Sequence, residues 1–455
     1  MMPANKQPVL VWFRRDLRIQ DNPALAFAMA SGQPVVPFYI YAPQEEKPWQ
    51  PGGASRWWLH QSLQCLHKSL QKMGLTLSFF KGNSEQIIKS LIQDTRATAL
   101  VWNNLYEPQI IKRDTRLEKS FGNIMIRRFD SGLFFTPGTL LNRQQQAYRV
   151  FTPFWKQARQ LLDTHGVRLT TSSGRQPVQR DTTKPGKACS LAQLGLLDGY
   201  PWYEKLMRYW QPGENGAQQR LGEFLDHIFL RYKQDRDFPA VDGTSRLSAH
   251  LHFGEITPTQ IYYQVQRHDF GKPYQASIER LLTELGWREF AHHVLWHFPM
   301  TAGQTMNDKF TNFWPARPNR RLLKKWQQGR TGIAIVDAGM RQLWETGWMH
   351  NRLRMIVGSL LTKNLGIHWL HGARWFWETL VDADLANNTL GWQWVAGCGV
   401  DAAPYYRIFN PDTQAERFDS KRDYIRRWLP QQADAPHVDL KQTREAALQR
   451  YRAMR

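Results

Sequence analysis

The stretch Val9-Leu10-Val11-Trp12-Phe13 decides the fold of the first part of the chain. It is apolar without alternation, as a parallel strand buried on both faces requires. Four later runs have the same character, with helical patterns such as 56–72 and 86–95 between them. These later runs are residues 35–41, 75–80, 99–102 and 124–126. Alternation of strands and helices predicts a doubly wound α/β domain with a parallel sheet over residues 1–135.

Residues 136–200 are predicted to form a long linker to a second domain. The centre of this stretch, 164–190, is rich in Thr, Ser, Gly, Pro and charge, and it is the poorest part of the chain for burial. Residues 201–455 then show long helical patterns and no convincing strand, which predicts an all-α domain. The clearest of these patterns are 216–232, 257–267, 278–296 and 333–363.

The charge of the chain points to a polyanionic partner. The 455 residues include 60 Lys and Arg against 39 Asp and Glu, a formal net charge of +21. Nucleic acid is the first candidate for such a surplus. General solubility is the weaker explanation, because about 2–8 net charges suffice for a small domain. The 20 tryptophans can serve packing, base stacking or one-electron redox chemistry, so their positions must decide among these roles.

The cysteines argue against disulfides and metal centres. Cys65, Cys189 and Cys398 lie far apart and form no paired motif, so neither a zinc site nor an iron–sulfur cluster is expected. Near the N-terminus the only apolar run is 9–13, which is too short for a signal peptide core or a membrane span. We therefore expect a reduced, cytoplasmic protein with no metal and no membrane partner.

Four short stretches in the helical half combine residues that bind ligands. Residues 243–248 offer hydroxyls, backbone amides and a guanidinium at a helix start, which suits a phosphate, although a plain N-cap uses the same residues. Glu284, Trp287 and Arg288 share one helix face. That face could receive a base or a flavin, and a surface ion pair beside a core tryptophan is an equally good interpretation.

The third and fourth stretches follow further along the chain. Asn351, Arg354, Met355 and Gly358 fall on one face of a predicted helix. Close approach of a ligand is one reason for the glycine, while packing in the core is the usual role of methionine. The turn-rich segment 382–404 gathers acids, amides and two tryptophans, which favours a functional loop over a purely structural polar turn.

Taken in order along the chain, these motifs resemble the photolyase/cryptochrome family nearly from end to end. The resemblance is carried by VWFRRDLR and DNPAL near the start, RDFPA and GTSRLS in the middle, and GWQW and DAAPYYRIFNP near the end. These motifs begin at residues 11, 21, 236, 243, 391 and 401. The resemblance implies an N-terminal α/β antenna domain and a C-terminal helical domain that holds FAD. The same layout follows independently from the patterns above.

Carried over position by position, the resemblance implies a FAD site. Its phosphate groups would be bound by Thr244, Ser245, Arg246, Leu247 and Ser248, with Tyr232 nearby. Contacts to the rest of the cofactor would come from Arg288, from an Arg354–Asp382 ion pair beside the isoalloxazine, from Asp384 and from Asn388. Asn388 would face flavin N5. Plant-type light sensors carry an acid there, so the amide favours a repair enzyme.

The resemblance further implies light-dependent repair of cyclobutane pyrimidine dimers in ultraviolet-damaged DNA, as in bacterial photo-lyases. Enzymes for the six-four photoproduct carry histidines where this chain has Asn351 and Met355. Splitting a cyclobutane needs an electron from excited reduced FAD rather than an acid, so a polarisable Met suffices. Glu284 would hydrogen-bond the dimer. Trp287 and Trp394 would flank the flipped dimer, and Arg407 would contact DNA.

Two further sites are implied. The tryptophan chain that photoreduces the flavin would run through Trp392 and Trp369, and Trp314 is the nearest candidate for its outer member, because Ala316 occupies the expected slot. Glu107 resembles the acid that holds a pterin, which favours methenyltetrahydrofolate as antenna, with a deazaflavin as the alternative. An ordinary helix-start carboxylate would also explain Glu107.

Three functions compete at this stage. The first is a monomeric deoxyribodipyrimidine photo-lyase, a carbon–carbon lyase whose partner is ultraviolet-damaged DNA. The second is a cryptochrome-type blue-light sensor without repair activity, and the third is a flavin-binding electron carrier of the same α/β lineage. Asn351, Met355, Asn388 and the surplus of positive charge favour the first.

Overall fold

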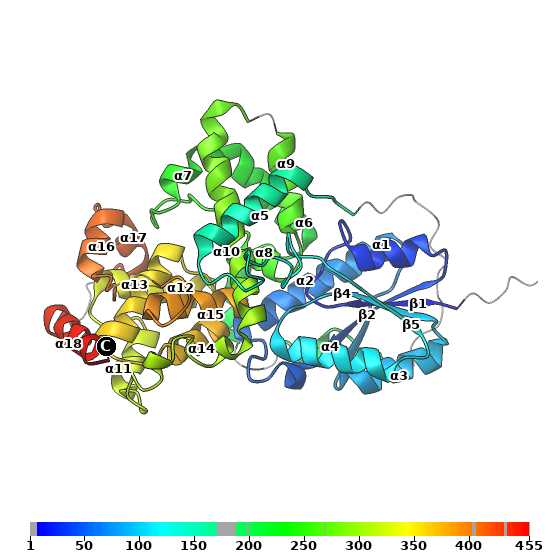
Figure 1. The fold of residues 1–455 in the computed structure, drawn as a ribbon, viewed down its shortest axis with the longest axis horizontal. Helices are drawn as coiled ribbons and strands as arrows, with labels where there is room; N and C mark the ends of the chain where they lie inside the picture. Colours follow the sequence, from blue (N-terminus) through cyan, green and yellow to red (C-terminus); the bar gives the residue numbers. More distant parts are fainter. Residues whose placement is uncertain are drawn as a thin grey trace, which may run out of the picture.

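A parallel sheet of five strands organises the first part of the chain, and helices make up most of the rest (Figure 1). The computed structural model describes residues 7–170, 188–197, 199, 201–268, 270–402, 406–431 and 435–454. Most of the predicted linker centre and Ala403, Pro404 and Tyr405 of the last motif lie outside the described residues.

The sheet has the strand order β3-β2-β1-β4-β5, and every neighbouring pair is parallel. Its strands are β1 Val9–Phe13, β2 Val35–Tyr41, β3 Ser78–Lys81, β4 Ala99–Asn103 and β5 Met125–Phe129. The helices that connect them are α1 Pro23–Ala30, α2 Gly53–Lys72, α3 Ser84–Thr95 and α4 Pro108–Ser120. The strand order reverses direction after β1, as in other doubly wound sheets.

The lack of alternation in the first strand is explained by burial on both faces. Val9, Val11 and Phe13 pack with residues of α1 and α2, whereas Leu10 and Trp12 pack with residues of α3 and α4. The predicted doubly wound α/β domain is confirmed.

Helices dominate from residue 201 onward, and among the described residues of this part the structure forms no β-strand. The longer helices are α6 Glu214–Glu223, α9 Pro258–Arg267, α10 Gln275–His297, α11 Arg320–Gln327, α12 Ala334–Thr346, α13 Asn351–Ser359, α14 Trp369–Thr379, α15 Leu385–Ala396, α16 Pro411–Phe418 and α18 Leu440–Met454. Shorter elements are α7 Tyr232–Asp235, α8 Ser248–His252, α17 Asp423–Trp428, the 3₁₀ turns η3 Pro201–Arg208 and η5 Phe229–Arg231, and the π turns η4 Phe224–Ile228 and η9 Leu360–Asn364. The predicted all-α second part is confirmed.

Two of the long helical patterns are interrupted. The 216–232 pattern becomes α6 and α7 with the turns η4 and η5 between them. The 333–363 pattern breaks at Gly347, which adopts a left-handed conformation (φ 67°) and closes α12 with a bond from its N–H to the Leu343 carbonyl. A side chain at Gly347 would lie 2.8 Å from Val381, so tertiary packing selects glycine there.

Part of the predicted linker is helical. Residues 151–165 form α5, Phe151–His165, which packs on α10 through a cluster that includes Phe151, Phe154 and Phe290. Its apolar residues recur at helical spacing, a pattern that the linker prediction overlooked. This segment therefore packs with the helical part of the molecule rather than connecting the two parts loosely.

A buried lysine makes stability depend on pH. Lys363 is 1% exposed, and its ammonium donates to the Arg407 carbonyl at 2.8 Å. Burial lowers the pKa of Lys363 to about 7 from 10.5. Between these values the unfolded chain binds more protons, so the free energy of unfolding should rise with pH through this window.

Replacing Lys363 with Met removes this contribution. From pH 7 to pH 9 the wild type should gain about 2 kcal/mol of unfolding free energy relative to Lys363→Met, because the wild-type ammonium loses its proton in the folded state. Urea unfolding of both proteins at the two pH values measures the difference. An equal pH dependence in both proteins would show that Lys363 keeps its proton when buried.

Candidate functional site

A buried carboxylate joins three segments that are distant in the sequence. Arg354 on α13 donates to both carboxylate oxygens of Asp382, at 3.1 and 2.8 Å. The hydroxyl of Ser248, the first residue of α8, donates to the same carboxylate at 2.6 Å. The Asp382 side chain is 3% exposed, whereas Ser248 is an exposed residue. Solvent therefore reaches this contact on the side of Ser248, and the structure brings together three of the residues expected around FAD.

The stretch before α8 is held in a fixed backbone conformation. Arg220 donates to the carbonyls of Thr244 and Ser245, both at 2.9 Å. Arg246 has a φ of 52°, in the left-handed region that residues other than glycine rarely adopt. Its guanidinium pairs with Asp242 at 3.1 Å. Leu247 is buried, whereas Thr244 and Ser245 are half-buried. This rigid turn therefore presents two partly accessible hydroxyl residues in front of the helix.

Asp384 lies in a different environment from Asp382. One of its oxygens caps α15 by accepting the Asn387 N–H at 2.9 Å, and the other lies 3.3 Å from His252 and 3.7 Å from His292. Burial alone would raise the pKa of Asp384, but His292, His252 and the Arg288 guanidinium together outweigh it and hold the pKa well below its usual range. The sequence analysis missed both histidines. The spacing of His292, four residues after Arg288 on α10, was the signal available.

Two further candidate cofactor residues are anchored to neighbouring backbone. Arg288 donates to the Gly132 carbonyl at 2.6 Å and to the Leu251 carbonyl at 3.4 Å, which ties α10 to the segment after β5 and to α8. The Asn388 side-chain amide donates to the Ala373 carbonyl at 3.1 Å. This donation uses only the amide nitrogen, so the side-chain oxygen keeps its capacity to accept a hydrogen bond.

The acid expected at the substrate is held by two arginines. Glu284 accepts from Arg280 at 2.8 Å and also pairs closely with Arg236. The Arg236 guanidinium lies 5.6 Å from the centre of the Tyr232 ring. Burial raises the pKa of this tyrosine above its ordinary value. The sequence analysis quoted Arg236 within a motif and assigned it no contact. Its role here is to orient the carboxylate of Glu284.

The face of α13 that carries Asn351 and Met355 is partly accessible. Asn351 is exposed, Met355 is half-buried, and the Met355 sulfur lies 3.9 Å from a guanidinium nitrogen of Arg352. Gly358, in contrast, faces protein. A side chain there would lie 3.2 Å from Val395 and 3.5 Å from Trp392. The idea that Gly358 admits a ligand is therefore wrong, because the glycine allows α13 to approach α15.

The two tryptophans expected to flank the substrate each contact neighbouring residues that position the indole ring. Trp287 stacks on Phe151 of α5, with ring centres 3.7 Å apart and planes within 8°. The Trp394 indole donates to the Asp401 carbonyl at 3.0 Å, and its ring centre lies 6.2 Å from that of Phe409. Each indole is thus positioned by contacts with neighbouring residues.

The three tryptophans expected in the electron chain are all buried. Trp392 contacts Phe376 and Trp326, with ring centres 4.9 and 6.2 Å apart. The ring of His368 lies between the other two members, at 5.7 Å from Trp369 and 4.9 Å from Trp314. Trp314 is only 6% exposed, so this candidate for the outer member does not itself reach the surface.

Gly372 on α14 creates the space for Trp392. A side chain at this position would come within 2.1 Å of the Trp392 ring. Gly372→Ala should therefore lower the free energy of unfolding by about 2 kcal/mol, because the ring must shift within a packed core. Urea unfolding measures the loss. Gly222→Ala on α6 is the matched control, since open space surrounds Gly222 and alanine favours a helix by up to about 1 kcal/mol.

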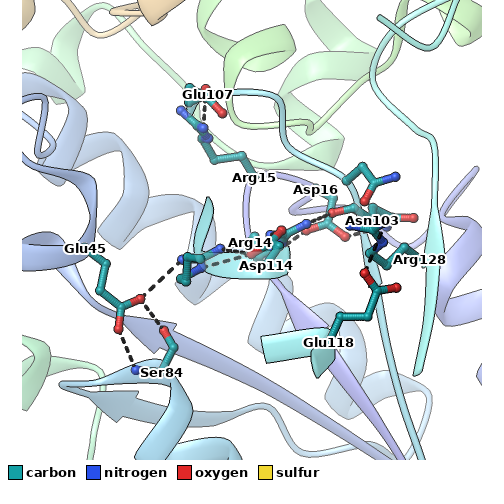
Figure 2. Close-up of polar contacts among 12 residues, drawn as sticks. Arg14, Arg15, Asp16, Glu45, Ser84, Asn103, Glu107, Asp114, Glu118 and Arg128 are labelled. Carbon is teal, nitrogen blue, oxygen red and sulfur yellow. Dashed lines mark hydrogen bonds and ion pairs between the residues drawn. The ribbon is translucent and has the colours of Figure 1, made fainter. Parts of the chain in front are cut away.

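Glu107 lies in the α/β domain, separate from the residues above. It precedes α4 and pairs with Arg15, and its second carboxylate oxygen is buried without a hydrogen-bond partner among the described residues (Figure 2). Arg14 binds the Asp114 carboxylate and the Asn103 carbonyl beside it. A cavity of about 50 Å³ at the carboxyl ends of β1 and β2 is lined by Arg15 and by His252 of α8. Arg15 therefore joins Glu107 to the boundary between the two parts.

Two searches of the described residues found no site of another kind. No cluster of His, Cys, Asp and Glu side chains in the described part of the chain is arranged to hold a metal ion. Within the same residues, no helix has the length and apolar character that crossing a membrane requires.

Comparisons with known proteins cover nearly the whole chain. Residues 9–174 match the family described as DNA photolyase, and residues 281–454 match the FAD binding domain of DNA photolyase. The chain is 42% identical to the deoxyribodipyrimidine photo-lyase of Agrobacterium fabrum, over 94% of this chain and 88% of that protein. It is 36% identical to cryptochrome-2 of Arabidopsis thaliana, over 94% of this chain and 71% of the relative. A solved bacterial class III photolyase from Agrobacterium tumefaciens has a TM-score of 0.90 at 38% identity, covering 100% of this chain and 99% of that structure.

Proposed function

The chain belongs to the photolyase/cryptochrome family, and we propose that it is a light-dependent DNA repair enzyme, a deoxyribodipyrimidine photo-lyase that splits cyclobutane pyrimidine dimers. The observation that supports this most is the combination of Asn351 and Met355 on the accessible face of α13 with the amide of Asn388. None of these three side chains is a strong acid, which suits a reaction that moves an electron and needs no proton donor.

The residues around Asp382 fit a flavin. Ser248 is accessible to a ligand and donates to Asp382, and Arg354 compensates the buried charge of this carboxylate. When bound, FAD supplies the light-driven one-electron chemistry, while the protein supplies position and electrostatics. The proposed roles of the chain are to bind phosphate groups at 244–248, to present the Arg354–Asp382 pair beside the isoalloxazine and Asp384 near its polar edge, and to orient the Asn388 amide.

Glu284, Trp287 and Trp394 are proposed to bind the lesion. The Glu284 carboxylate is ionically paired on one side and keeps lone pairs for base N–H groups. The two indoles are fixed by Phe151 and by the Asp401 carbonyl, so they offer rigid apolar walls to a flipped pyrimidine pair. A damaged pair costs less to extrude than an intact one, which contributes selectivity.

The antenna is proposed to be methenyltetrahydrofolate, with a deazaflavin as the alternative. The unpartnered oxygen of Glu107 supports the first, because a pterin carries amino groups that can donate to a buried carboxylate. An absorption spectrum of the purified protein tests it. A near-ultraviolet band that disappears in Glu107→Gln is expected, whereas a band that persists in this variant would remove Glu107 from the antenna site.

A repair assay tests the main proposal. The purified, chemically reduced protein should restore thymines in a dimer-containing oligonucleotide under blue light, and Met355→His should repair several-fold more slowly with unchanged FAD content. Met355→Leu is the control that keeps an apolar side chain of similar size. We expect the active species to be a cytoplasmic monomer bound to damaged DNA. Absence of any repaired thymine would reject the enzyme and favour a cryptochrome-type sensor, a class also found among its relatives.

A further inference from the structure

We propose that a groove along α18 is a second DNA contact, which binds the phosphodiester backbone of the strand that flanks the lesion. This inference rests on the proposed function, since it concerns the same substrate at a greater distance from the dimer. The α18 groove has a volume of about 420 Å³. It is lined by Tyr406, Arg407, Arg444, Leu448, Tyr451 and Arg452.

Three cations face this groove. Arg444 and Arg452 are separated by eight residues on one face of α18, and Arg407 belongs to the loop that precedes α16. All three are exposed, and no acidic residue lines the groove. Among the described residues no carboxylate lies within ion-pair distance of any of the three. Guanidinium groups that are exposed and uncompensated are suited to phosphate, which they bind through two parallel hydrogen bonds.

The floor of the groove is built by contacts between α18 and the loop 406–410. Tyr406 and Tyr451 stack with ring centres 4.6 Å apart and planes within 10°, which joins the loop to α18. The Lys363 ammonium lies 3.7 Å from the centre of the Tyr406 ring and donates to the Arg407 carbonyl at 2.8 Å. Arg450 on α18 donates to the Lys363 carbonyl at 2.9 Å. These contacts hold the loop that carries Arg407 against α18, the helix that carries Arg444 and Arg452.

The position of the groove selects DNA as its occupant. The Arg407 guanidinium lies 5.0 Å from the centre of the Phe409 ring, and that ring lies 6.2 Å from Trp394, a proposed wall of the lesion site. The loop 406–410 therefore contacts the proposed lesion site through Phe409 and the α18 groove through Arg407. A strand whose dimer enters the lesion site is continuous with flanking phosphates, and the positive groove is complementary to them.

The test is the salt dependence of DNA binding. Binding of the full-length protein to a dimer-containing duplex is measured by fluorescence anisotropy between 50 and 200 mM salt. Losing two phosphate contacts in Arg444→Gln/Arg452→Gln should lower the slope of log K against log salt by about 1.8. The loss of affinity relative to wild type should therefore be about tenfold larger at 50 mM than at 200 mM salt. It should also shrink as the duplex is shortened toward the lesion. Arg444→Lys/Arg452→Lys should keep the wild-type slope.

The matched control removes the same number of positive charges from another part of the protein. Lys89→Gln/Lys119→Gln removes two exposed cations from α3 and α4, at the opposite end of the molecule from α18 (Figure 1), and should leave the slope unchanged. If the groove double variant binds with the wild-type slope, the α18 groove is no DNA contact, whatever the repair assay shows. If the slope falls equally in the control, the effect is one of net charge and the inference also fails. Repair is scored separately, so failure of the proposed function is recognised by wild-type protein that repairs no dimer.

Discussion

Trp392→Phe should stop light-driven reduction of the bound flavin and leave repair by chemically reduced protein intact. Phenylalanine fills most of the same space between Phe376 and Trp326 but is far harder to oxidise than an indole. We expect the rate of photoreduction to fall about a hundredfold, which corresponds to about 2.7 kcal/mol of barrier. Time-resolved absorption of the flavin under blue light, with an external reductant present, measures this rate.

Two further substitutions test the tryptophan chain: one is a control outside it, and the other changes its proposed outer member. Trp102→Phe changes a buried tryptophan in β4 of the α/β domain and should leave photoreduction unchanged. Trp314→Phe should slow it if electrons pass through the His368 ring between Trp314 and Trp369. Wild-type photoreduction kinetics in Trp392→Phe would contradict the proposed tryptophan chain. Wild-type kinetics in Trp314→Phe alone would show that another residue is its outer member.

Arg354→Met should give a protein that retains little flavin. The substitution leaves the Asp382 carboxylate buried with only the Ser248 hydroxyl as partner. Removing one partner of a buried ion pair costs about 3–5 kcal/mol of folding stability. Because Arg354 is also proposed to contact the flavin, and a hydrogen bond to a charged group contributes about 1.5–3 kcal/mol, flavin affinity should fall about 10- to 100-fold. The ratio of visible to ultraviolet absorbance and a reconstitution titration with FAD measure the loss.

A second variant separates cofactor binding from folding. Arg354→Met/Asp382→Leu removes both charges, and an apolar pair of similar volume should recover most of the folding stability that the single change loses. It should not recover flavin binding, because the charged pair itself is proposed to lie beside the isoalloxazine. Recovery of full flavin content in the double variant would contradict the proposed role of Arg354 and Asp382.

Much of the fold could be predicted from local patterns. The first strand reads as buried on both faces because its alternate residues enter two separate cores, so every position is apolar. Thr257 and Gln260 form a capping box at the start of α9, with Pro258 at the first helical position. Such features depend on residues within a few positions of one another, which is why they are legible without the tertiary structure.

The predicted boundaries that differ from the structure are set by contacts between residues distant in the sequence. The break between α12 and α13 needs Val381 and Leu206 beside Gly347, and the helix inside the predicted linker is stabilised by α10. Neither partner is close in sequence. Gly358 was likewise interpreted as space for a ligand because nothing local reveals that α15 packs against it.

The candidate site divides in the same way. Motifs in the sequence identified Ser248, Arg354 and Asp382 as belonging to one site, but only the fold shows that a single buried carboxylate joins the other two across 134 and 28 residues. His252 beside Asp384, Arg236 beside Glu284 and the α18 groove became apparent only in the tertiary structure. The sequence by itself determined the fold class, the family and the types of residue available for chemistry, because these depend on local pattern and order. The tertiary structure alone decided which charges are paired and which face open space, because pairing depends on distances that only long-range packing sets.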